Sequence, residues 1–81
     1  MDIIDLIELL GLQDHTCKEF GVILTYKQND NQVAFSQNEN SVTVGIYEIA
    51  KIPVYFHIFG TTPISYIVKL RQAIYDVIAP F

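Results

Sequence analysis

Positive charge is scarce in this chain of 81 residues, which has five lysine and arginine residues against nine aspartate and glutamate residues and a formal net charge of −4. A nucleic-acid-binding surface needs clustered basic side chains to neutralise phosphates. The five bases are spread along the sequence, so we expect no binding of DNA or RNA. Nine acids are also too few for a mimic of a phosphate backbone.

Long apolar runs are also missing. A membrane-spanning helix needs roughly 20 consecutive apolar residues, and the longest apolar stretches here are broken by Lys51, His57, Lys69, Arg71 or Asp76. The first residues are apolar but include acids at positions 2, 5 and 8, where a signal peptide would carry positive charge. We therefore expect a cytoplasmic protein with no membrane partner.

The chain has one cysteine, so it cannot build the disulfide framework typical of small secreted domains. Cys17 lies in the stretch DHTCKE, residues 14–19. Catalysis there would need Cys17 as nucleophile, His15 or His57 as base and Asp14 to orient it, but no glycine-rich oxyanion cradle lies nearby. A zinc site could recruit His15, Cys17, His57 and one acid, yet the paired ligand spacing of such sites is absent. We interpret the stretch as a polar link between a helix and a strand.

Phosphate-binding motifs are absent too. Neither G-x-x-x-x-G-K-[ST] nor G-x-G-x-x-G occurs, and the four glycines stand alone. We therefore predict a protein that is not an enzyme, with no catalytic residue, no metal ligand and no cofactor.

Apolar residues, by contrast, are abundant. They make up 51% of the chain and charged residues 17%, against roughly 45–50% and about 25% in average soluble domains. At this length residues 1–81 form a single domain, which is marginally stable alone. The surplus apolar surface must then meet a partner protein or line a small-molecule cavity between helices and sheet, and both alternatives stay open.

Residue periodicity gives the order of the elements. Apolar residues at helical spacing predict a helix over residues 2–10 that stops at Gly11. Alternation from Phe20 and the polar turn at 28–32 predict a hairpin over 20–37. A second polar turn precedes extended segments at 42–49 and 54–59, and we interpret Pro53 as part of a turn between two strands.

A second helix follows, with Thr62 as N-cap, Pro63 at the first helical position and Pro80 at its end. The predicted fold class is α+β, in the order α-β-β-β(-β)-α. Its antiparallel sheet has three or four strands and is flanked by the N- and C-terminal helices. The same order resembles that of double-stranded RNA-binding domains. The lysine-rich start of their second helix is missing from TTPISYIVKL (residues 61–70), so the resemblance does not extend to RNA binding.

The second helix is apolar around most of its circumference. Its polar residues Ser65, Lys69, Gln72 and Asp76 share a stripe roughly 60° wide, whereas packing on one sheet uses an apolar arc of only a little over 100°. The excess predicts that this helix is the seam of a homodimer or larger symmetric assembly. The predicted interface residues are Tyr66, Ile67, Leu70, Arg71, Ile74, Tyr75 and Ile78.

Arg71 lies inside the apolar arc and has two interpretations. Its stem can cover apolar surface while the guanidinium reaches water. Alternatively, it pairs with a carboxylate of the other chain, such as Glu48 or Asp76.

A second surface is indicated by Tyr47, Tyr55 and His57, which can form an aromatic patch that contacts a partner, since tyrosine is enriched in interface cores. Ordinary sheet packing explains the same residues equally well. In its length and its Asn, Ile and Lys usage the chain resembles small accessory proteins of bacteriophages and mobile elements, including inhibitors of host defence. We therefore expect a small interaction module that self-associates and inhibits or modulates a larger host protein.

Overall fold

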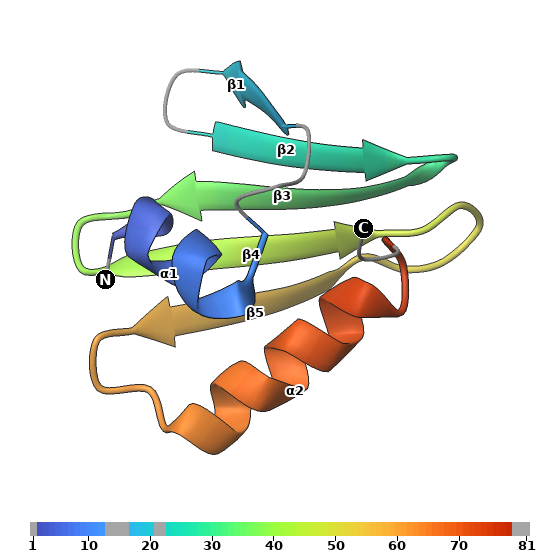
Figure 1. Ribbon diagram of the computed structural model, residues 1–81. Helices are drawn as coiled ribbons and strands as arrows, with labels where there is room; N and C mark the ends of the chain where they lie inside the picture. Colours follow the sequence, from blue (N-terminus) through green and yellow to red (C-terminus); the bar gives the residue numbers. More distant parts are fainter. Residues whose placement is uncertain (1, 13–16, 21–22, 79–81) are drawn as a thin grey trace.

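The computed structural model describes residues 2–12, 17–20 and 23–78. The elements within these ranges are α1 (Ile3–Leu10), β1 (Cys17–Phe20), β2 (Ile23–Gln28), β3 (Asn31–Gln37), β4 (Ser41–Tyr47), β5 (Val54–Phe59) and α2 (Ile64–Tyr75). The strands form one antiparallel sheet, and both helices lie on the same side of it (Figure 1). The predicted α+β fold, with a helix before and after an antiparallel sheet, is confirmed.

The sheet is a simple meander in the order β1-β2-β3-β4-β5, in which each strand pairs with the next along the chain. Asn29 adopts the left-handed conformation, with φ of 56°, in the tight turn between β2 and β3. Residues 42–59 form two strands rather than one bent strand, with Pro53 directly before β5. The turn predicted around Pro53 is therefore confirmed.

The strand β1 adds a fifth strand at one edge of the sheet, where Cys17 lies opposite Tyr26 of β2. The stretch interpreted as a polar link thus contributes Cys17, Lys18 and Glu19 to a strand, and that interpretation was wrong for these three residues. Charged residues are typical of edge strands, which they protect from further pairing, and here they hid the alternation of a strand. Asp14, His15 and Thr16 lie outside the described residues.

The helix α1 ends where the sequence predicts and begins one residue later, at Ile3. The Asp2 carboxylate caps it by accepting a hydrogen bond from the Ile4 N–H at 2.9 Å. Gly11 ends it in the left-handed conformation, with φ of 74°, which glycine adopts without steric cost. At its start, the Ile3 N–H donates to Oε1 of Gln37 at 2.8 Å, which joins the helix to β3.

The helix α2 differs from the prediction at both ends. Pro63 is its N-cap, and the Thr62 hydroxyl instead accepts a hydrogen bond from the Phe59 N–H at 2.8 Å. The helix ends at Tyr75, so it does not reach Pro80. Val77 and Ile78 follow the helix and are buried in the core, which means that counting them on a helical wheel overstated the apolar arc.

The hydrophobic core fills the space between the sheet and the two helices. It joins four residues of α1 to Phe35, Val44 and Ile58 of the sheet. Four of the predicted interface residues belong to this core, with exposed fractions of 5% for Ile67, 0% for Leu70 and Ile74, and 2% for Ile78. These four side chains are thus buried within the single chain, because α2 packs on the sheet and also contacts α1.

Candidate interaction surface

The face of the sheet opposite the helices carries the predicted aromatic patch. Strand pairing sets Thr43 opposite His57, Gly45 opposite Tyr55 and Ser41 opposite Phe59, and residues directly opposite in an antiparallel pair share a face. We call the set made of Thr43, Gly45, Tyr47, Tyr55, His57 and Phe59 the outer aromatic surface. The structure thus brings Tyr47, Tyr55 and His57 together on adjacent strands, as the sequence indicated.

The two tyrosines of this surface contact each other directly. Their rings meet edge to face, with centroids 5.9 Å apart and an interplanar angle of 83°, a favoured geometry for aromatic pairs. The Tyr47 hydroxyl donates to the Tyr55 hydroxyl at 3.3 Å. Tyr55 is nevertheless 53% exposed and Phe59 47% exposed, so much aromatic area faces solvent.

Gly45 makes room for this arrangement. A Cβ atom at this position would lie 2.8 Å from Cε2 and from the hydroxyl of Tyr47. The Tyr47 ring therefore lies back over the glycine of its own strand, next to Tyr55. Gly45 was not among the residues predicted from the sequence, although an isolated glycine inside a strand often marks a place where another group approaches the backbone closely.

The surroundings of the Tyr47 hydroxyl favour its protonated form. Its hydrogen bond to Tyr55 raises the pKa of Tyr47 above the usual value, and partial burial adds to this shift. Ionisation would remove the proton that Tyr47 donates, so the protonated form is favoured in the folded protein.

His57 lies at the end of a short series of hydrogen bonds. The Asn38 amide donates to the Thr43 hydroxyl at 2.7 Å, and this hydroxyl lies 3.2 Å from Nδ1 of His57. Since the hydroxyl already accepts one hydrogen bond, its own proton can go to Nδ1. This favours the tautomer with the proton on Nε2, which leaves a donor on an exposed imidazole.

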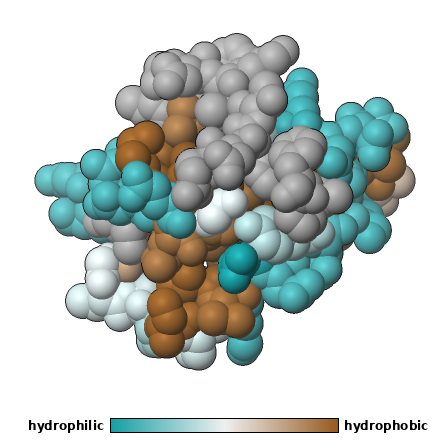
Figure 2. Space-filling view, viewed as in Figure 1, coloured by the Kyte–Doolittle hydropathy of each residue, from teal (hydrophilic) through white to brown (hydrophobic). Residues whose placement is uncertain are grey.

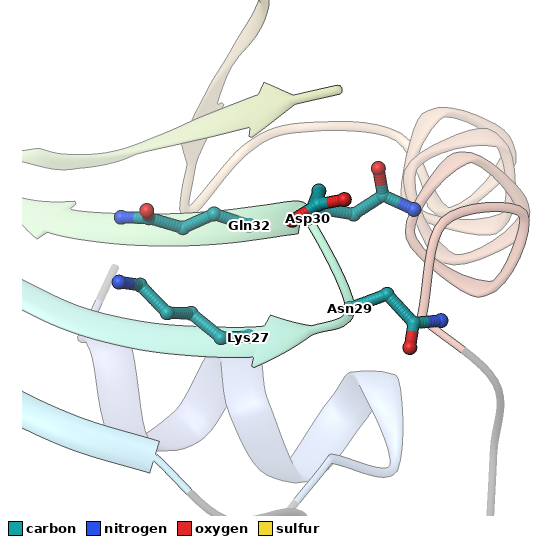
Figure 3. Close-up of a pocket in the computed structure, with 5 residues that line it drawn as sticks. Lys27, Asn29, Asp30 and Gln32 are labelled. Atoms are coloured by element: carbon teal, nitrogen blue, oxygen red, sulfur yellow. The ribbon is translucent and has the colours of Figure 1, made fainter. Parts of the chain in front are cut away.

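A separate hollow of about 230 Å³ lies at the turn between β2 and β3, lined by Lys27, Asn29, Asp30, Asn31 and Gln32. The side chains of Lys27 and Gln32 run side by side, while that of Asn29 points the other way (Figure 3). The Asn31 amide donates to the Val77 C=O at 3.0 Å, which ties the turn to the segment that follows α2. Because these polar groups do not converge on one point, the hollow offers no organised ligand site.

The helix-bearing side of the molecule also has exposed apolar residues, visible as brown areas in Figure 2. Ile64 and Val68 lie one turn apart on α2 and are 67% and 61% exposed. Arg71 is exposed and lies over the Tyr75 ring, with Cζ 5.2 Å from the centroid. This position agrees with the interpretation in which its guanidinium stays at the surface. Tyr66 and Tyr75 are partly buried against the core.

Metal-ligating side chains do not gather in the described part of the chain, where no group of three or more His, Cys, Asp or Glu residues could hold an ion. His15 lies outside the described residues. Neither described helix is long and apolar enough to cross a membrane.

Comparison with known proteins gives no relative for this chain. No protein-family model, curated protein or solved structure matches it.

Proposed function

We propose that this protein is a non-enzymatic interaction module that binds a larger protein through the outer aromatic surface. The observation that carries the proposal is the exposed cluster of Tyr47, Tyr55, His57 and Phe59 on the sheet face directed away from α1 and α2. Tyrosine and phenylalanine are enriched in the cores of protein interfaces, where they bury large areas at low entropic cost.

The charges near this surface support a protein partner over a nucleic acid. Aromatic side chains on a sheet can stack on bases, but such platforms need basic side chains to hold phosphates. Lys51, beyond the end of β4, is paired with Glu48 at 3.0 Å. No lysine or arginine occurs in β4 or β5, so the rings and hydroxyls of these two strands have no basic side chain among them except the imidazole of His57. Lys27 of β2 lies on the same face of the sheet, two strands away from Tyr47.

The wider proposal is a cytoplasmic accessory protein, of the kind that phages and mobile elements encode, that inhibits a host protein by covering a functional surface. Self-association remains part of this proposal. Its contact would have to use residues that the monomer leaves exposed, such as Ile64 and Val68, because Ile67, Leu70 and Ile74 are buried in the core.

Affinity capture from the source cell tests the proposal. Wild-type protein and a Tyr47→Ala, Tyr55→Ala double variant would be used as bait, with Lys69→Ala as the control because Lys69 is exposed on the polar stripe of α2. We expect a protein captured by wild type and by the control, and lost by about tenfold or more with the double variant. Equal capture by all three folded baits would reject the outer aromatic surface as the binding site.

A further inference from the structure

The strand β5 forms one edge of the sheet, since β4 is its one strand partner within the described residues. Exposed edges are usually protected by charged residues or by a proline within the strand. The sequence of β5, VYFHIF, has neither. In such an edge strand every second residue directs its N–H and C=O away from the sheet.

A hydrogen bond in the turn between β3 and β4 identifies which residues of β5 direct their backbone N–H and C=O groups outward. The Ser41 C=O accepts from the Asn38 N–H at 2.8 Å, so the backbone of Ser41 faces β3. Ser41 lies opposite Phe59, and opposite residues in an antiparallel pair either face each other or both face away. The backbone N–H and C=O groups of Phe59 therefore point away from β4. The same holds for His57 and Tyr55, which lie two and four residues before it in the strand.

Two local features limit the free part of this edge. The Phe59 N–H donates to the Thr62 hydroxyl at 2.8 Å, and the Phe59 C=O accepts from the Thr62 N–H at 3.0 Å. At the other end, the outward position belongs to Pro53, which has no N–H to donate. The outward N–H and C=O groups of Tyr55 and His57 therefore remain available for pairing, since no partner for them is found in the part of the chain that the structure describes.

We propose that the partner protein docks on β5 as an extended strand, antiparallel to it, with two residues that exchange hydrogen bonds with Tyr55 and His57. This inference rests on the proposed interaction function and names the form of the partner. Extended strands that add to an exposed sheet edge gain affinity from such backbone bonds. A helix could not supply them, because its own N–H and C=O groups are already paired.

The side chains around the edge define what the added strand should contain. The residue between its two bonding positions lies opposite Phe56, whose ring is 5.8 Å from that of Tyr66 of α2 at an angle of 66°. An apolar side chain fits there. The two bonding residues share the outer face with the Tyr55 and His57 rings and add to the outer aromatic surface. No charge of β5 calls for a charged residue at any of these positions.

Two substitutions of His57 separate the contribution of its backbone N–H from that of its imidazole. Both His57→Ala and His57→Pro remove the imidazole, but only the proline also removes the outward N–H. Proline is tolerated on an edge strand when its missing N–H faces solvent. Thermal unfolding followed by circular dichroism would show that both variants remain folded.

The probe is a set of random nonapeptides displayed on phage and selected on the wild-type protein. We expect His57→Ala to lose only the contribution of the imidazole, and His57→Pro to bind the selected peptides about tenfold or more weakly than His57→Ala. Bound peptides should also slow exchange of the Tyr55 and His57 amide protons of the wild type in NMR spectra. Failure to select any peptide, or selected peptides that bind both variants equally, would overturn the strand-docking proposal. A cellular partner that needs Tyr47 and Tyr55 but binds both His57 variants equally would leave the proposed function intact and also reject strand docking.

Discussion

Gly45 determines how Tyr47 lies on the sheet, because the Tyr47 ring occupies the space that a Cβ atom of residue 45 would need. Gly45→Ala should therefore displace the ring and break its hydrogen bond to Tyr55. The clash involves the outer end of a side chain, and alanine restricts the unfolded chain more than glycine does. We expect stability to change by less than about 1 kcal/mol.

Gly45→Ala should change the outer aromatic surface and leave the fold unchanged. A spectrophotometric titration of Gly45→Ala should give a lower pKa for Tyr47 than in wild type, with an unchanged circular dichroism spectrum. A Tyr47 titration identical to that of wild type would show that the glycine is not what positions the ring. Tyr55→Phe is the matched control, because it removes the hydroxyl that accepts the Tyr47 proton and leaves Gly45 in place.

The titration of Tyr47 also predicts how stability depends on pH. Because its pKa is raised in the folded state, this group's contribution is fully present below the unfolded pKa of about 10 and is lost as pH rises through the folded pKa. The free energy of unfolding of wild type should fall more steeply above about pH 10 than that of Tyr47→Phe. Urea unfolding of both proteins across this range measures the difference, and parallel curves would contradict it.

At the scale of elements, α2 is where sequence and structure differ most. Its polar stripe of Ser65, Lys69, Gln72 and Asp76 is exposed, as its spacing indicates. The interface prediction failed to allow for α1, whose Leu10 C=O accepts from the Tyr75 hydroxyl at 2.7 Å. A helical wheel shows which residues share a direction, but it cannot show that a second helix lies beside the first.

Two apolar residues of α2 give a matched test of this packing. Ile74 is completely buried and Val68 is 61% exposed. Ile74→Ala should lower the free energy of unfolding by about 2–5 kcal/mol, a large share of the total for a small domain. Val68→Ala should change it by about 0.5 kcal/mol or less.

Denaturant unfolding measures both values. Similar small changes for the two variants would mean that α2 does not pack as described. A charged residue at position 74 would be buried in the core and unfold the protein, so a dimer contact on α2 has to be probed at Ile64 or Val68 instead.

Much of the element order followed from the sequence because local signals were strong. Gly11 ends the first helix, and the polar turn at 28–32 and Pro53 separate strands, as predicted. The fifth strand was missed because Lys18 and Glu19 obscure alternation. Thr62 was misplaced because its hydroxyl can either cap a helix or close the end of a strand, and only the neighbouring chain decides between the two.

At the scale of the whole molecule, the two faces of the sheet have different roles. One face is covered by α1 and α2 and holds the core, whereas the other, directed away from both helices, carries Tyr47, Tyr55 and His57. The sequence indicated these three residues but could not choose between a partner surface and ordinary packing. That choice depends on which face the helices cover, which is a property of the complete fold.

A partner protein that covers the outer aromatic surface should protect the strands beneath it from hydrogen exchange. Hydrogen exchange measured by mass spectrometry, on the protein alone and in complex with its captured partner, tests this without any substitution. We predict slower exchange in β5 and the adjoining part of β4, with no change in α2. Slower exchange confined to α1 and α2, with β5 unchanged, would contradict the account.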